Sequence, residues 1–130
     1  MKTKAFLNGV SDQVVLDAIT QASRKTSGEI RVFVSHHKVK DAVTAAHREF
    51  ARMGLHEADD RNAVLIYVSP KSRKFAVIGD HGVHQHCNDG FWTTLAGEME
   101  QYFRKGEWTE GLVHGVAKAG ELLGEKFPKT

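Results

Sequence analysis

The sequence predicts an α/β fold in which a small mixed β-sheet is packed between helices, in the order α-β-α-β-β-α-α. Three observations support this prediction. Apolar residues recur every three or four positions in four segments, which is the period of an amphipathic helix. Three shorter segments have the alternating or continuous apolar pattern of strands. A helical segment separates the first two strands, whereas a short turn joins the last two, so one parallel and one antiparallel pair are expected.

The first predicted helix begins after Ser11, whose hydroxyl is a suitable N-cap, and ends near Lys25. Its apolar positions are Val14 or Val15, Ala18, Ile19 and Ala22. The string "EIRVFV" follows and alternates as a half-buried strand does. Asp41 precedes a second helical pattern, which Gly54 closes as a left-handed cap.

Residues 63–68 are apolar on both faces, which is typical of a central strand covered by helices on each side. The turn string "SPKSR" then leads into a third strand at residues 74–78, and the two strands are expected to form an antiparallel hairpin. Two helices complete the chain, the first starting near Phe91, with Gly106 between them. Their predicted buried faces are Trp92, Leu95, Met99 and Phe103 on the first, and Leu112, Val116, Ala119 and Leu123 on the second.

The composition predicts one folded domain over residues 1–130, because a single core usually extends to about 100–150 residues. The formal net charge is +2 and the basic residues are dispersed among acids, which argues against nucleic-acid binding. No run approaches the roughly 20 apolar residues of a membrane span, and no signal segment is evident. Cys87 is the one cysteine, so no internal disulfide can form and a cytoplasmic location is expected.

Four aspartates flank the predicted hairpin and the segment after it: Asp59, Asp60, Asp80 and Asp89. In an antiparallel pair, the residue before one strand and the residue after its partner lie at the same end of the sheet, so Asp60 and Asp80 should be neighbours. Carboxylate oxygens are the ligands that calcium and magnesium prefer. The four aspartates are therefore candidate ligands of a divalent cation. The alternative for Asp89, or for Asn88, is to cap the following helix.

The same segment carries a group of potential zinc ligands: His81, His84, His86 and Cys87. Their spacing is irregular and no second ligand pair of a zinc motif is present, so zinc is less favoured than calcium or magnesium. No phosphatase loop surrounds Cys87, which argues against covalent cysteine chemistry. His81, adjacent to Asp80, is the candidate general acid or base, and these two residues are the candidate catalytic residues.

Four strings resemble the TPM domain family, which is named after a thylakoid lumen protein, a photosystem II repair protein and a membrane accessory protein of acetylcholine receptors. They are "TSGEIRV", "RNAVLIYVS", "KFAVIGDHGV" and "FRKGEWTEGLVHGVAKAGELLGEKFP", and together they extend over nearly the whole chain. The resemblance is to a short, cytoplasmic-looking bacterial branch. It implies a single TPM-like domain over residues 1–130.

The resemblance leaves two functions open. Some family members are described as acid phosphatases or as binding divalent cations, and others act in the assembly or repair of membrane complexes. One reading is a divalent-cation-binding or protein-interaction module without strong catalysis, whose protein partner is unknown. The other is a metal-dependent acid phosphatase acting on phosphoesters. The binding module is favoured, because the residues do not supply a complete set of nucleophile, base and charge stabiliser.

One departure from the family pattern bears on the cation site. Many relatives read "DNG" just before the central strand, where this sequence reads "RNA". Arg61 therefore stands where an acidic residue is common. If that acidic residue helps to hold a metal ion, the site in this chain must be rebuilt from Asp59 or Asp60, or be absent.

Overall fold

The computed structural model describes residues 1–129, apart from the side chain of Asp89, and within them the predicted mixed sheet is confirmed. The sheet has three strands in the order β1 (Ile30–Val34), β2 (Val64–Ser69) and β3 (Lys74–Gly79). β1 and β2 are parallel, with Ile30 opposite Val64. β2 and β3 are antiparallel, as the short turn between them predicts. The central strand is therefore the one with the continuous apolar pattern.

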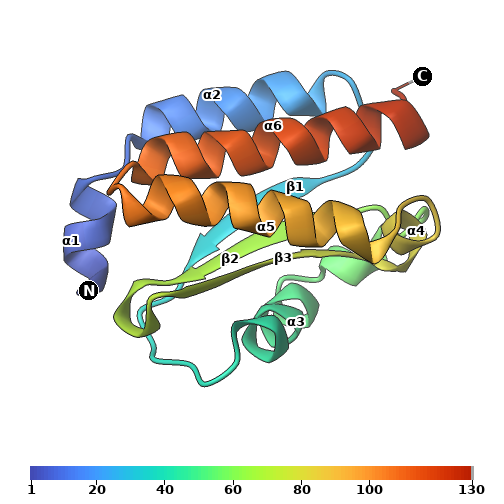
Figure 1. Ribbon diagram of the computed structural model, residues 1–130. Helices are drawn as coiled ribbons and strands as arrows, with labels where there is room; N and C mark the ends of the chain where they lie inside the picture. Colours follow the sequence, from blue (N-terminus) through green and yellow to red (C-terminus); the bar gives the residue numbers. More distant parts are fainter. Residues whose placement is uncertain (130) are drawn as a thin grey trace.

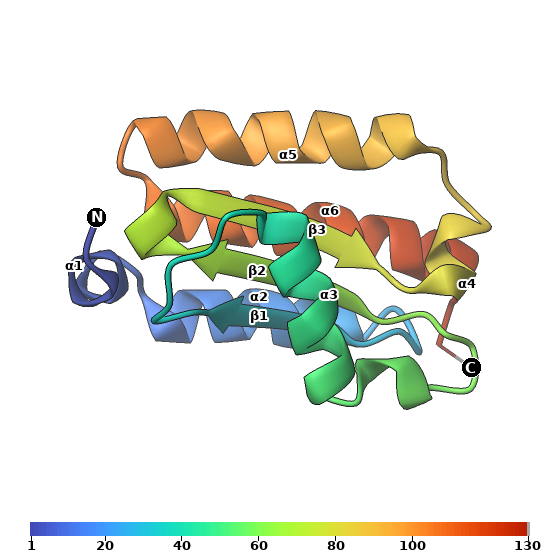
Figure 2. The same cartoon turned by 90° about the horizontal axis from the view of Figure 1, so that it is seen from below.

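Helices cover both faces of the sheet (Figure 1). One face carries α2 (Asp12–Ser23), α5 (Asp89–Arg104) and α6 (Trp108–Lys126). The other face carries α3 (Ala42–Arg52), which crosses the strands in the view from below (Figure 2). This arrangement confirms the layered α/β architecture and explains why β2 is apolar on both faces.

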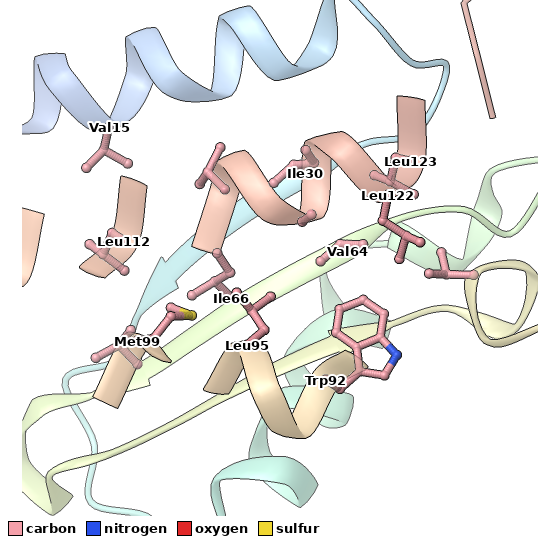
Figure 3. Close-up of a cluster of buried hydrophobic side chains, with 14 of the residues drawn as sticks. Val15, Ile30, Val64, Ile66, Trp92, Leu95, Met99, Leu112, Leu122 and Leu123 are labelled. Atoms are coloured by element: carbon pink, nitrogen blue, oxygen red, sulfur yellow. The ribbon is translucent and has the colours of Figure 1, made fainter. Parts of the chain in front are cut away.

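Side chains of β2 alternate between two buried clusters on opposite faces of the sheet. Val64 and Ile66 point toward the layer of α2, α5 and α6, where they meet Leu95 and Leu112 (Figure 3). Leu65 and Tyr67 point to the other face and pack with Phe50 and neighbouring residues of α3. The predicted faces of α5 and α6 are those that contribute to the first cluster. In α2, Val15 is buried and Val14 is exposed. Of the two valines that the helical period allowed on the buried face, Val15 is therefore the one that packs against the core.

The predicted helix boundaries rest on the expected capping residues. The Ser11 hydroxyl accepts a hydrogen bond from the Val14 amide, and the Asp41 carboxylate accepts one from the Val43 amide. Asn88, rather than Asp89, is the N-cap of α5, because its side-chain oxygen accepts from the Phe91 amide at 3.1 Å. Gly54 has a φ of 71°, the left-handed conformation predicted for the end of the second helix.

Two short helices were not predicted from the sequence. They are α1 (Thr3–Asn8) and α4 (His81–His84), and each is too short to show a helical period. Two single turns of 3₁₀ helix also occur, at Leu55–Glu57 and Pro70–Ser72, and the second forms the β2–β3 turn. Among residues 1–129, no helix combines the length and the apolar character that a membrane crossing requires.

Candidate functional site

We call the end of the sheet where β2 begins and β3 ends the acidic rim, because Asp59 and Asp60 precede β2 and Asp80 follows β3. The short helix α4 lies at this end of the sheet (Figure 1). The Asp80 amide donates to the carbonyl of Ala63 at 2.9 Å, and the Gly82 amide donates to the carbonyl of Arg61 at 2.9 Å. These bonds tie the segment after β3 to the segment before β2. The antiparallel hairpin thus brings the two segments together, as the sequence predicts.

Asp80 is buried at this rim and is bound by Arg61 through two hydrogen bonds. The Nε of Arg61 donates to one carboxylate oxygen at 2.7 Å, and Nη2 donates to the other at 2.9 Å. The backbone amide of His81 donates to the same carboxylate at 2.7 Å, so Asp80 is also the N-cap of α4. Paired N–H donors in a fork are the strongest arrangement that a guanidinium offers a carboxylate. The structure therefore gives Asp80 an internal cation as its partner.

Arg61 adopts an unusual backbone conformation in making this pair. Its φ is 50°, in the left-handed region that costs a residue with a side chain roughly 1–2 kcal/mol. Aspartate and asparagine adopt this conformation more readily than arginine does. The chain therefore accepts local backbone strain at the position where the guanidinium meets Asp80, and the two hydrogen bonds offset that strain.

The surroundings of Asp80 act on its pKa in opposite directions. Burial raises the pKa of the carboxyl, whereas the hydrogen bonds from Arg61 and from the His81 amide lower it. The bonds and the positive charge outweigh burial, so the pKa lies below the ordinary aspartate value of 3.8. The same pairing raises the pKa of Arg61. Asp80 is accordingly a charged, paired carboxylate at neutral pH and has no proton to give.

The structure describes the side chains of two of the other three predicted metal ligands. Asp59 and Asp60 are exposed on the loop before β2. The side chain of Asp89 lies outside the described residues. Within the described part of the chain, no three side chains of His, Cys, Asp or Glu lie together in a way that could hold a metal ion. A calcium or magnesium site formed by these four aspartates stays a prediction.

The predicted histidine and cysteine ligands point to separate neighbours. His81, the candidate acid or base, is exposed, and its Nε2 lies 3.1 Å from the side-chain nitrogen of Gln85. His86 packs edge-on against Phe127, with ring centroids 5.2 Å apart. The Cys87 sulfur lies 3.5 Å from the carbonyl oxygen of Val83 and is partly buried against the core. Asp80 and His81 are thus adjacent in the sequence, but their side chains have different partners.

Sequence reasoning missed a cavity of about 850 Å³ at the opposite end of the sheet. We call it the carboxyl-end cavity, because Val68 and Ser69, at the carboxyl end of the central strand, contribute to its lining. Its other lining residues come from segments far apart in the sequence, including Phe6, Lys40, Arg73 and Trp108. The predicted parallel pair of strands could have indicated this location, because ligands of open α/β sheets commonly bind beyond the carboxyl ends of parallel strands.

Comparison with known proteins places this architecture in a family. The model of the TPM domain matches residues 1–122. No curated protein matches the sequence closely. Two solved structures are similar in fold. The NMR structure of the BA42 protein from the psychrophilic bacterium Bizionia argentinensis has 32% identity and a TM-score of 0.83, over 93% of this chain and 86% of that one.

The second structure is the N-terminal domain of a protein from P. gingivalis, also determined by NMR. It has 15% identity and a TM-score of 0.70, over 91% of this chain and 78% of that one, and so it supports the fold alone. The family model extends over almost the whole chain, and the observed order of strands and helices agrees with the strings that suggested the resemblance. The chain therefore belongs to the TPM domain family.

Proposed function

We propose that this TPM domain is a binding module without strong catalysis. The observation that carries the proposal is the ion pair of Asp80 and Arg61, in which both carboxylate oxygens accept hydrogen bonds from the guanidinium. A metal-dependent phosphatase needs acidic oxygens that are open to a metal ion, or a base that can activate water. Asp80 is poorly suited to either role, because Arg61 neutralises its charge and engages its oxygens.

Arg61 acts on Asp80 as a bound cation acts on a carboxylate. It supplies a positive charge and donates a hydrogen bond to each of the two oxygens. The residues around Asp80 therefore do not fit a divalent cation while Arg61 is in place. Calcium or magnesium binding at this rim is the alternative, and it requires Arg61 to leave Asp80 and the exposed Asp59 or Asp60 to approach.

Thermal melting of two Arg61 variants tests this proposal. Arg61→Asn removes the ion pair and suits the left-handed backbone, and Arg61→Asp also adds a second carboxylate beside Asp80. Because the side chain of Arg61 is 48% exposed, we expect the melting temperature to fall by less than it would on breaking a fully buried pair. Calcium at millimolar concentration should restore the melting temperature of Arg61→Asp, since a ligand bound by the native state raises stability.

The parent chain and Arg61→Asn provide the matched controls in this experiment. Their melting temperatures should respond little to calcium, magnesium or zinc, and chelator should leave them unchanged. A saturable rise in the melting temperature of the parent chain that Asp80→Asn lacks would instead favour the cation-binding alternative. Hydrolysis of p-nitrophenyl phosphate by the parent chain, abolished by chelator and by Asp80→Asn, would overturn the assignment as a module without strong catalysis.

A protein partner and a cytoplasmic location belong to the same proposal. The single cysteine, Cys87, supports a reducing compartment, because it has no second cysteine with which to form an internal disulfide. A pull-down with the parent chain and with Arg61→Asp addresses the partner. Partners retained by one protein and lost by the other would assign the acidic rim to the interface.

A further inference from the structure

The carboxyl-end cavity lies at the end of the sheet opposite Asp80, because its lining includes residues of α1 and of the β2–β3 turn. Both of these segments lie at that end of the sheet in Figure 1. Its volume of about 850 Å³ is within the range of roughly 300–1,000 Å³ found for small-molecule sites. Its lining comes from α1, α3, α5, α6 and the hairpin turn. The walls of the cavity are thus assembled only when every layer of the fold is in place.

One wall of the cavity consists of four aromatic side chains from four elements: Phe6, Phe75, Phe103 and Trp108. The rings contact one another in a connected group, with centroids 5.0 Å apart for Phe75 and Phe103 and 5.4 Å apart for Phe6 and Trp108. Phe6 is buried, whereas the other three rings are partly exposed. Such a wall suits a flat apolar body that can pack against ring edges and faces.

The cavity also carries an excess of positive charge. Four cationic side chains line it, and they are Lys40, Arg73, Lys74 and Arg104, against the two carboxylates Asp41 and Glu100. Both carboxylates are engaged within the protein. Asp41 accepts hydrogen bonds from the Val43 amide and the Thr44 hydroxyl at the start of α3, and Glu100 pairs with Arg104 at 2.7 Å.

Two of the cations remain available to a ligand, because Arg104 pairs with Glu100 and the Lys74 ammonium donates a hydrogen bond to the Lys40 carbonyl oxygen. Among the residues that the structure describes, Lys40 and Arg73 have no carboxylate within ion-pair distance. They lie on the loop before α3 and on the β2–β3 turn, and both are exposed residues that line the cavity. A ligand that enters beside the aromatic wall therefore meets unpaired positive charge.

We propose that the carboxyl-end cavity binds a small organic anion, in which an aromatic or similarly flat apolar body carries a carboxylate, phosphate or sulfonate group. The apolar body packs on the aromatic wall, and the anionic group pairs with Arg73 and Lys40. The inference rests on the proposed function in one respect, since it assumes binding without turnover. It adds a site and a class of ligand at the end of the sheet remote from Arg61.

Two fluorescent probes of similar shape test this inference: 8-anilinonaphthalene-1-sulfonate, an anion, and N-phenyl-1-naphthylamine, which lacks the sulfonate. We expect saturable one-to-one binding of the anion and about fivefold or more weaker binding of the neutral probe. Arg73→Glu should weaken the anion about tenfold and leave the neutral probe unchanged. Arg24→Glu, which reverses an exposed charge at the far end of α2, is the matched control and should bind both probes as the parent chain does.

Amide chemical shifts locate the bound anion independently of affinity. The expected changes lie at residues 40–43 and 73–75, and the amides around Asp80 should not move. Equal affinity for both probes, no effect of Arg73→Glu, or shifts confined to the exposed Val14 and Leu16 would overturn the proposal. A dimer that the anion dissociates would assign the cavity to a second copy of the chain. None of these results bears on the Arg61 melting test, which reports on the opposite end of the sheet.

Discussion

Asp80 carries two structural roles with one carboxylate. It caps α4 through the His81 amide, and it pairs with Arg61, which precedes the central strand. The side chain thus joins the end of β3 to the start of β2 outside the ladder of backbone hydrogen bonds. Because the carboxylate is buried, removal of its partner leaves a charge that water solvates poorly. Stability should therefore depend on the ionisation of this single residue.

We predict that acid weakens the fold through Asp80. The folded-state pKa lies below the ordinary value of 3.8, so the unfolded chain takes up the proton first as the pH falls. The ion pair is therefore fully stabilising above about pH 4–5 and loses its contribution as the pH falls through the lower folded-state pKa. Asp80→Asn should cost about 1–3 kcal/mol at pH 7, and urea unfolding should show that difference shrinking by pH 3.

The comparison variant for the acid experiment is Asp59→Asn, which changes an exposed aspartate near the same rim. Its effect on the free energy of unfolding should be within about 0.5 kcal/mol at pH 7. If the stability difference between the parent chain and Asp80→Asn is the same at pH 3 and pH 7, the charge of Asp80 does not stabilise the fold.

At the scale of elements, the attachment of α4 depends on the absence of a side chain at Gly82. A Cβ at this position would lie 2.1 Å from the carbonyl oxygen of Asp60 and 2.7 Å from that of Arg61. Both are backbone atoms, which cannot move aside as the end of a flexible side chain can. The close approach also permits the hydrogen bond from the Gly82 amide to Arg61. A four-residue helix is thus held by its contact with the segment before β2.

We predict opposite signs for two glycine-to-alanine substitutions. Gly82→Ala should destabilise the protein by about 1–3 kcal/mol, as overpacking of a tight contact does. Gly97→Ala, on the exposed side of α5 where a Cβ would meet nothing within 4 Å, should stabilise it by about 0.5–1 kcal/mol. Chemical denaturation of both variants checks the pair. A neutral Gly82→Ala would mean that α4 detaches from the rim at no cost.

At the scale of the whole molecule, β2 couples the two buried layers. Leu65 and Ile66 are adjacent in the sequence, fully buried, and directed to opposite clusters. Disorder in either layer would expose one face of the central strand to water. The two layers are therefore expected to unfold together rather than one after the other.

We predict that Leu65→Ala and Ile66→Ala each lower the free energy of unfolding by about 2–5 kcal/mol. Each variant should still unfold in a single transition when tryptophan fluorescence and circular dichroism are compared during urea denaturation. Leu16→Ala, at a position that is 55% exposed, should change stability by no more than about 0.5 kcal/mol. Two separated transitions in either core variant would show that the layers are independent.

The amino-acid sequence by itself determined the elements and much of their packing. Periodicity identified the buried faces of α5 and α6, and the continuous apolar run identified β2 as the central strand. Capping chemistry located the starts of α2, α3 and α5. These features are local, because a helix or strand must place its apolar residues at its own period and must satisfy its terminal amides nearby. Local rules also predicted that the segments before β2 and after β3 would meet.

Only the tertiary structure decided how the side chains at those ends are paired. Arg61 and Asp80 are 19 positions apart, and nothing in their spacing indicates that a guanidinium would take the place expected for a metal ion. The carboxyl-end cavity could not be predicted for the same reason, since its lining residues come from segments spread between Met1 and Trp108. Side-chain pairing and cavity shape depend on how whole helices and strands are placed in three dimensions. The periodicity of apolar residues within one element does not determine that placement.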